Sequence, residues 1–183
     1  MRALIKKISH RIAEVNKYTK DQEEQIEYAM KICSFELIKI FLVILIFSLL
    51  GYASKVIVAM IVMITTRSFI GGYHEDNQVK CFVATFLINA GVIYLGCTVH
   101  IGIIGKIIIY LLALFCIWNQ APIVNPLMPI TREELLRRNK IVGTTITLIF
   151  VIISIVFENN KDLSNVILWM IVFQVMLMFN KEK

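Results

Sequence analysis

Charged residues are scarce in this chain, and they gather in clusters. Asp, Glu, Lys and Arg make up 17% of its 183 residues, whereas about a quarter of a soluble domain is charged. The mean hydropathy is +0.75, and long apolar stretches run between the charged clusters. This pattern excludes an ordinary soluble domain and predicts helices that cross a membrane. The length suits one compact bundle and leaves no room for a second, soluble domain.

Several motifs of enzymes and binding proteins are also missing. The four cysteines form no Cys-x-x-Cys pair and have no His at zinc spacing, which argues against a zinc site or a disulfide framework. His74-Glu75 is not followed by the second His of a zinc protease. The sequence contains neither a Gly-x-Ser-x-Gly elbow nor a Gly-rich phosphate loop. We therefore expect neither a metal nor another cofactor.

The net charge of +6 does not predict a nucleic-acid partner. The basic residues flank apolar segments, and no aromatic side chains are interleaved with them to stack on bases. Anionic lipid headgroups explain the basic positions more simply. We expect anionic membrane lipids, and no nucleic acid, among the partners of the chain.

We expect a single membrane domain over 1–183, in which a charged arm over 1–31 precedes a helical bundle over 35–179. The arm lacks the apolar central run of a cleavable signal peptide. Apolar residues recur at helical spacing within 2–17, and basic residues fill the positions between them. The apolar residues are Leu4, Ile5, Ile8, Ile12 and Val15, and the basic ones are Arg2, Lys6, Lys7, Arg11 and Lys17. The pattern predicts a basic amphipathic helix lying on the membrane surface; the alternative is a helix packed on the bundle.

About six apolar segments predict an all-α integral membrane bundle. Thr19 and Gln22 have the spacing of a capping box, so a helix should begin there and run into a first segment near 35–53. Glu36 and Lys39 are three residues apart in that segment and can pair on one face. Four later segments are clearly delimited, and they cover 81–99, 103–118, 141–157 and 163–179.

The remaining segment is short. Val56 to Ile64 provides nine apolar residues before Thr65 and Thr66, whereas a full span needs about twenty. With the flanking residues it reaches 52–70 as a tilted span. The alternative is a shallow or re-entrant helix.

The distribution of Lys and Arg predicts the orientation of the bundle. If the N-terminus is cytoplasmic, the segments 1–31, 67–80, 119–140 and 181–183 carry seven, two, four and two of the 19 Lys and Arg residues on that side. The opposite side carries Lys55, Lys106 and Lys161, and Lys39 lies within a span. This positive-inside bias places both termini and the 67–80 loop in the cytoplasm.

The stretch from Arg67 to Cys81 gathers residues with catalytic potential. A diglycine turn, Gly71-Gly72, leads to His74, and Cys81 opens the next apolar segment at the predicted cytoplasmic edge. A thiolate is a strong nucleophile, and the positive end of the helix dipole favours it. A His within hydrogen-bond reach takes the thiol proton and later returns it.

The spacing of His74 and Cys81 constrains how they can meet. Seven residues of straight helix separate two side chains by about 10.5 Å, which is too long for a hydrogen bond. We therefore expect His74 in a turn that folds back over the helix start. Glu75, Asp76 and Asn77 are each candidates to orient His74, with Asn77 or Asp76 preferred.

Two amide side chains lie within apolar segments of the sequence. Asn89 and Gln174 lie inside predicted spans, where amide side chains usually bridge helices. We interpret both as bridges between helices, with a role in substrate binding as the alternative.

These motifs resemble those of the accessory gene regulator B (AgrB) family. The first motif is Arg67, three residues, Gly71-Gly72, one residue, His74, six residues, Cys81. The second is the loop that begins Ala121-Pro122 and has further prolines at Pro126 and Pro129. Length, hydropathy and the basic arm match as well, so the resemblance covers nearly the whole chain. A departure is Met128, where Lys is frequent in the family.

The resemblance implies a cytoplasm-facing cysteine endopeptidase of a Gram-positive bacterium, acting on a short AgrD-like propeptide. Cys81 would be the nucleophile and His74 the general base and acid. Arg67, Gly71, Gly72 and Asn77 would shape the site or contact the substrate. The acyl-enzyme would be a thioester, which an internal Cys or Ser of the peptide attacks to close a cyclic thiolactone or lactone for quorum sensing. The family also suggests a homodimer.

A different class of function stays open from the residues alone. A small membrane protein of this composition is also compatible with a peptide exporter subunit or a membrane scaffold. In either case Cys81 and His74 would be replaceable. An exporter should line a path with polar residues, and the spans offer few, mainly Asn89 and Gln174.

Overall fold

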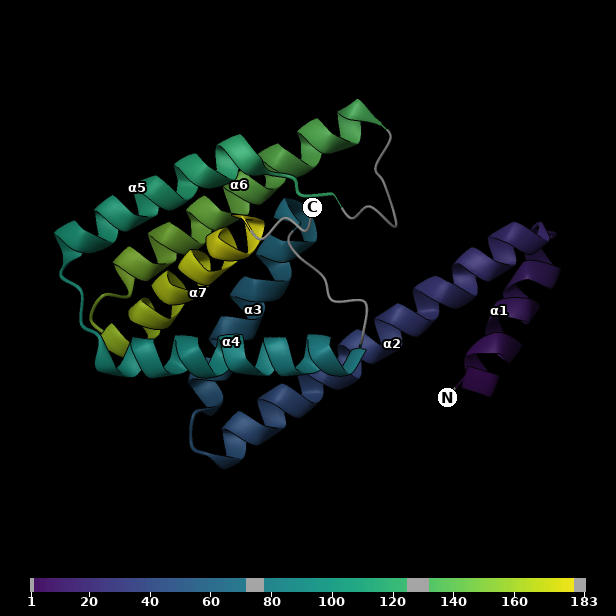
Figure 1. The fold of residues 1–183 in the computed structure, drawn as a ribbon, viewed down its shortest axis with the longest axis horizontal. Helices are drawn as coiled ribbons and strands as arrows, with labels where there is room; N and C mark the ends of the chain where they lie inside the picture. Colours follow the sequence, from purple (N-terminus) through teal and green to yellow (C-terminus); the bar gives the residue numbers. More distant parts are fainter. Residues whose placement is uncertain (1, 72–77, 125–131, 180–183) are drawn as a thin grey trace. The chain divides into compact units, whose positions relative to one another are not determined.

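The computed structural model describes residues 2–71, 78–124 and 132–179, and these ranges contain helices and no strand. The helices are α1 (Arg2–Asn16), α2 (Lys20–Leu49), α3 (Ala53–Ile70), α4 (Gln78–Thr98), α5 (Ile103–Gln120), α6 (Glu133–Val156) and α7 (Lys161–Phe179) (Figure 1). Helices α2 to α7 are long and apolar enough to cross a membrane. The predicted all-α membrane architecture is therefore confirmed.

The chain divides into two compact units, Met1–Val43 and Ile44–Lys183. The first unit holds α1 and most of α2. Thr19 and Gln22 form the predicted capping box between them: the Thr19 N–H donates to Gln22 Oε1 at 2.9 Å, and the Gln22 N–H donates to Thr19 Oγ1 at 3.4 Å. Lys17 has a positive φ of 53°, which turns the chain sharply just before the cap.

Further along α2, the predicted pair on one helix face is also present. Lys39 Nζ lies 2.6 Å from Glu36 Oε2, and the Lys39 side chain is 9% exposed. An ammonium held this close to a carboxylate can enter an apolar segment at lower cost, because the pair is nearly neutral.

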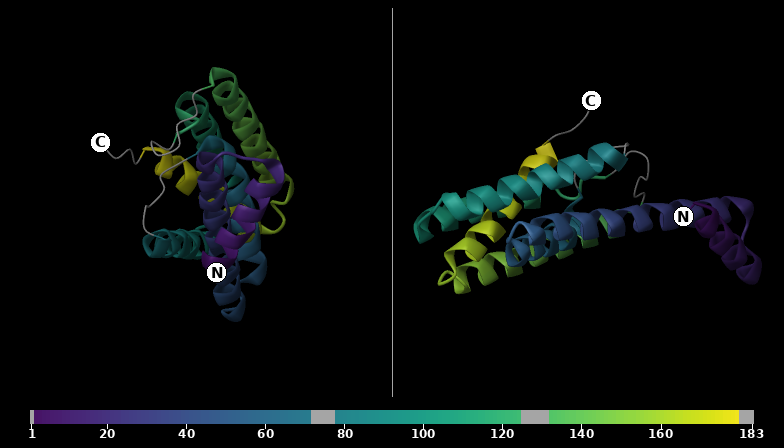
Figure 2. Two further views of the ribbon diagram at one scale, coloured as in Figure 1. Left: turned by 90° about the vertical axis from the view of Figure 1, so that its right-hand side faces the viewer. Right: turned by 90° about the horizontal axis from the view of Figure 1, so that it is seen from below.

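Helix α7 is the centre of the second unit, because it contacts α3, α4, α5 and α6. Figure 1 shows α7 with α4 on one side and α5 and α6 on the other, and Figure 2 shows the same helices from two further directions. The contact with α4 is close: a Cβ added at Gly96 would lie 2.7 Å from Val166 Cγ2 and 3.3 Å from its backbone. A glycine at this position therefore lets the two helices approach.

The short second segment forms one continuous helix, α3, of 18 residues that meets the length and composition of a membrane span. The two threonines near its end do not interrupt the helix, because each of their hydroxyls donates to a carbonyl four residues earlier. Thr65 Oγ1 donates to Ile61 O at 2.6 Å, and Thr66 Oγ1 donates to Val62 O at 2.6 Å. The span is thus favoured over the shallow alternative.

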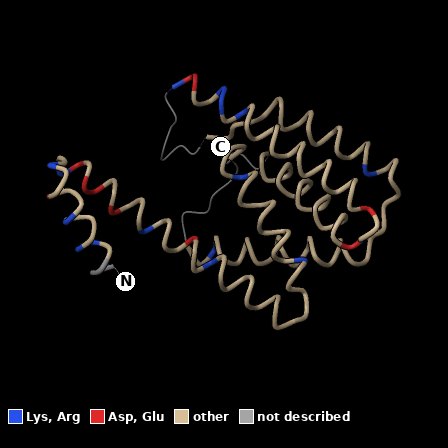
Figure 3. Tube along the Cα trace, turned by 180° about the vertical axis from the view of Figure 1, so that it is seen from behind, with Lys and Arg blue, Asp and Glu red and all other residues tan. Residues whose placement is uncertain are grey.

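Charges lie mostly at the ends of the helices of this unit, as Figure 3 shows. At the end remote from Cys81, Lys106 is fully buried and its Nζ lies 2.6 Å from Glu158 Oε2 and 2.7 Å from Ser164 Oγ. Tyr110 donates to Ser154 Oγ, and Ser164 Oγ donates to Ser154 O at 2.8 Å. The network ties α5, α6 and α7 together.

A second ion pair lies at the same end. Lys55 Nζ of α3 lies 2.8 Å from Asp162 Oδ2 of α7 and 3.2 Å from Cys97 Sγ. Two of the three lysines on the predicted outer side are thus neutralised by acids near the start of α7.

The Glu158 carboxyl is in the turn after α6. Burial raises its pKa, but hydrogen bonds from Lys106 and Ser164 and the positive charges of Lys106 and Lys161 outweigh this, so the pKa is below its ordinary value. The Glu158 carboxylate therefore stays ionised at neutral pH, and its contribution to stability is lost only as the pH falls through this lowered pKa.

Breaking this pair should destabilise the bundle. Glu158→Gln leaves the buried charge of Lys106 without a partner, which costs about 3–5 kcal/mol of unfolding free energy. At about 2–4 °C per kcal/mol, we expect the unfolding temperature in detergent to fall by about 6–20 °C. The double variant Lys106→Met/Glu158→Gln should be more stable than Glu158→Gln, because no buried charge is orphaned. The exposed Lys161→Met is the control. Equal melting of Glu158→Gln and Lys161→Met would contradict this role of the pair.

Candidate active site

The structure describes three of the predicted site residues, Arg67, Gly71 and Cys81. Gly72, His74 and Asn77 lie outside the described residues, as do Glu75 and Asp76. The pairing of His74 with Cys81, and the group that orients His74, therefore stay predictions.

Cys81 lies where the sequence predicts it, in the first turn of a membrane helix. Helix α4 begins at Gln78, three residues earlier. The Cys81 side chain is half-buried, and its carbonyl accepts a hydrogen bond from Thr85 Oγ1 at 2.8 Å. The Cys81 thiol therefore lies near the positive end of the helix dipole.

The face of α4 beyond Cys81 is polar as well as buried. Thr85 and Asn89 follow at intervals of four residues and are 2% and 0% exposed. Asn89 Nδ2 donates to Thr85 O at 2.8 Å within the same helix, so the prediction that Asn89 bridges two helices is wrong for the described contacts. The same prediction is confirmed for Gln174, whose Nε2 donates from α7 to Met63 O of α3 at 3.3 Å.

Gly71 lies at the C-terminal end of α3, one turn after Arg67. Its N–H still donates to Arg67 O at 3.0 Å, as in a helix, and its φ of 74° then turns the chain out of the helix. Arg67 itself is half-buried in the last turn of α3, where the negative end of the helix dipole stabilises a positive charge. These contacts set the point at which the chain leaves α3 for the motif.

The two sequence motifs meet in space at Gly71. An isolated parallel β-bridge joins Gly71 to Ile123, and the Ile123 N–H donates to Ile70 O at 2.9 Å. Ile123 follows Ala121-Pro122, whose peptide bond is cis. The sequence did not predict this contact, because neither hydropathy nor helical period reports which loops pair.

Glycine at position 71 is required by both conformation and space. Its φ of 74° and ψ of −155° lie in a region that essentially only glycine adopts. A Cβ added there would lie 2.0 Å from Ile123 O, which is backbone and cannot rotate away. The structure therefore explains why the first residue of the diglycine is a glycine.

An apolar cluster supports this contact from within the bundle. Its buried members are Ile70, Ile117, Ala121 and Met178, and the partly buried Ile123 and Val175 pack against it. The cluster joins α3, α5 and α7 to the 121–124 segment. It holds the start of the proline-containing loop beside the end of α3.

Basic side chains near this end of the bundle differ in their surroundings. Lys140 Nζ lies 4.8 Å from the ring centroid of Trp118, within the range of a cation–π interaction. Arg137 and Arg138 are exposed. Across the described ranges, no group of three His, Cys, Asp or Glu residues is arranged to hold a metal ion.

Comparison with known proteins identifies the relatives of the chain. A family model described as "Accessory gene regulator B" matches residues 4–178. "Putative AgrB-like protein 1" of Clostridium perfringens (strain 13 / Type A) is 36% identical over 183 residues, which is 100% of this chain and 98% of that protein. No solved structure matches the chain.

Substitution of Gly71 should be more harmful than substitution of another glycine with positive φ. Gly51 has a φ of 86°, but a Cβ there would meet nothing within 4 Å. We expect Gly51→Ala to cost about 1–2 kcal/mol from conformation alone. Gly71→Ala should cost more, because Ile123 must also move. Thermal unfolding in detergent compares the two variants, and equal unfolding temperatures would show that the contact with Ile123 is unimportant.

Proposed function

Because the chain belongs to the accessory gene regulator B family, which acts in a quorum-sensing system, we propose that it is a membrane-embedded cysteine endopeptidase. Its substrate is a short AgrD-like propeptide, from which it removes the C-terminal part. The observation that carries this proposal is the position of Cys81 in the first turn of α4. There a thiol can be activated by the helix dipole and by a histidine of the preceding loop.

The proposed first step forms a thioester. His74 accepts the proton of the Cys81 thiol, and the thiolate attacks the carbonyl carbon of the scissile peptide bond. The tetrahedral intermediate collapses as His74 donates that proton to the leaving amine. The C-terminal part departs with a free amino group, and the rest of the propeptide stays bound to Cys81 Sγ.

The proposed second step closes the ring without water. An internal Cys or Ser of the bound peptide loses its proton to His74, and its sulfur or oxygen attacks the thioester carbonyl. The bond to Cys81 Sγ breaks, and the thiolate recovers its proton from His74. The product is a cyclic thiolactone or lactone. Excluding water from the site favours this route over hydrolysis.

Other residues have supporting roles in this proposal. Gly71 sets the path of the chain beside Ile123, and Gly72, which matches the family motif, is a candidate to shape the site. Arg67 at the end of α3 is a candidate contact for the substrate, and Asn77 is a candidate to orient His74. Exposed Arg137 and Arg138 would favour a propeptide with an acidic tail.

We also propose that the termini and the site face the cytoplasm and that the protein is a homodimer. Orientation is supported by the Lys and Arg bias. A homodimer is in keeping with the family.

The dyad is tested by co-expression with the cognate propeptide and mass spectrometry of the peptide products. We expect the parent protein to cut the propeptide and both Cys81→Ala and His74→Ala to leave it intact, with activity reduced at least about a hundredfold as for a lost general base. Cys97→Ala is the matched control, since its thiol contacts Lys55 at the other end of α4.

The outcome also separates the two classes of function. If Cys81→Ala still yields cut peptide, the endopeptidase proposal is wrong, and an exporter subunit or membrane scaffold becomes the better reading. Protein levels in the membrane fraction must match between variants, so that loss of cutting is not loss of protein.

The thioester is tested by removing the nucleophile that resolves it. A propeptide with its internal Cys or Ser replaced by Ala should accumulate as an adduct on the protein. The expected mass gain equals the N-terminal part of the propeptide, and neutral hydroxylamine should remove it. Cys81→Ala should carry no adduct. Cutting of this propeptide without any adduct at short times would instead indicate direct hydrolysis by an activated water.

A further inference from the structure

Helix α1 has two apolar rows, and their surroundings differ. The covered row consists of Ile5, Ser9 and Ala13, which are at most 5% exposed. The open row consists of Ile8, Ile12 and Val15, which are 40%, 37% and 75% exposed. Packing within the protein therefore uses only part of the apolar surface predicted from the sequence. Exposed apolar residues that share one face of a helix indicate a further interaction surface.

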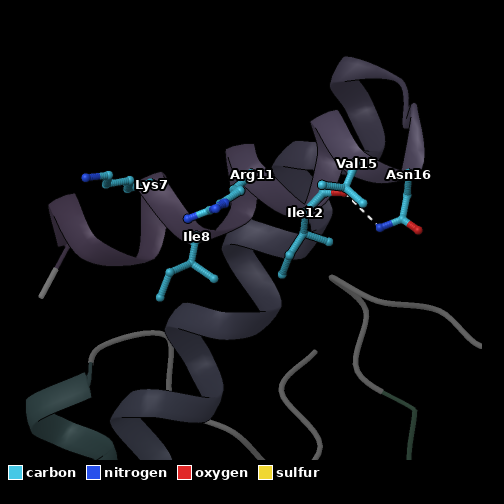
Figure 4. A pocket seen from close by; sticks show the side chains of 6 residues that line it. All are labelled: Lys7, Ile8, Arg11, Ile12, Val15 and Asn16. Carbon is cyan, nitrogen blue, oxygen red and sulfur yellow. Dashed lines mark hydrogen bonds between the residues drawn. The ribbon is translucent and has the colours of Figure 1, made fainter.

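Cations border the open row. Lys7 and Arg11 are one helical turn apart, and together with Asn16 and the open row they line a shallow hollow on α1 (Figure 4). On a helix of 3.6 residues per turn, Arg11 lies next to Val15, whereas Glu14 lies beyond Lys7, farther from the row. The edge of the apolar row nearest these residues is therefore cationic.

The orientation of this face is fixed within the first unit. His10 Nδ1 lies 3.0 Å from Glu23 Oε1, which joins α1 to the first turns of α2. The turn at Lys17 and the Thr19–Gln22 capping box set where α2 begins. Since α2 continues into a membrane span, α1 is tethered within reach of the bilayer surface.

We propose that the open row of α1 docks onto an anionic lipid surface. Ile8, Ile12 and Val15 would enter the boundary between headgroups and acyl chains, and Lys7 and Arg11 would extend their alkyl stems so that the charges meet lipid phosphates. Charge complementarity selects this occupant: anionic headgroups match a cationic border, and the acyl layer matches the apolar row.

A protein occupant fits the same face less well. Two copies of the face in a symmetric dimer would bring the cationic borders of both copies into one interface, and like charges repel. Three apolar side chains also give much less area than the roughly 800 Å² per partner of a stable protein interface. A bilayer needs neither shape complementarity nor an acidic partner chain.

The test places a fluorescent label on the open row of the full-length chain. Val15→Cys is labelled with an environment-sensitive dye after the four native cysteines have been replaced, and the protein is placed in nanodiscs with and without phosphatidylglycerol in phosphatidylcholine. We expect a blue-shifted emission, and quenching by lipid-attached spin labels, in the discs that contain phosphatidylglycerol. Glu14→Cys, on the far side of Lys7, should remain in water in both.

A matched pair of charge variants tests the role of the cationic border. Lys7→Gln should weaken docking of the Val15 label about fivefold, the effect of one basic residue near an anionic surface. Lys6→Gln removes the same charge from a position away from the open row and should have little effect. Added salt should weaken docking because it screens these charges.

Two outcomes would overturn the proposal. In one, the Val15 label stays in water in both kinds of disc, which would mean that the row is not buried in lipid. In the other, the label is shielded equally with and without phosphatidylglycerol and Lys7→Gln changes nothing, which would point to cover by protein. Neither outcome depends on peptide cleavage, so failure here would leave the endopeptidase proposal untouched.

Discussion

The constraint on which the structure depends is that a backbone inside a lipid bilayer must satisfy its own hydrogen bonds. Helices meet this requirement segment by segment, so the apolar stretches of the chain become α2 to α7. Polar residues are accommodated by the same rule. Thr65 and Thr66 return their hydroxyls to carbonyls of their own helix, and Gln174 uses its amide to join α7 to α3. The bundle is therefore apolar outside and selectively polar within.

Much of this architecture could be predicted from residue order, because helical signals are local. The capping box of Thr19 and Gln22, the Glu36–Lys39 pair and the start of α4 near Cys81 all depend on residues a few positions apart. Helix α6 begins at Glu133, ahead of the apolar segment 141–157, because a charged turn can be helical while hydropathy registers only the apolar part.

The contacts that could not be predicted join residues far apart in the chain. Gly71 and Ile123 are separated by 52 positions, and Lys55 and Asp162 by 107. Composition and spacing report which residues are available, but not which loop reaches which helix end. The family resemblance identified the two motifs that contain Gly71 and Ile123. The structure shows that they are in direct contact, because the backbone at Ile123 is hydrogen-bonded to the end of α3 at Ile70.

The central position of α7 has a consequence for how the protein is made. It leaves the ribosome after α3, α4, α5 and α6, yet all four contact it. The acids that neutralise Lys55 and Lys106 lie at or just before its start. Earlier helices therefore enter the membrane without their common partner, and two lysines await their counter-ions. The contacts that hold these four helices to α7 therefore form only once α7 has itself been synthesised.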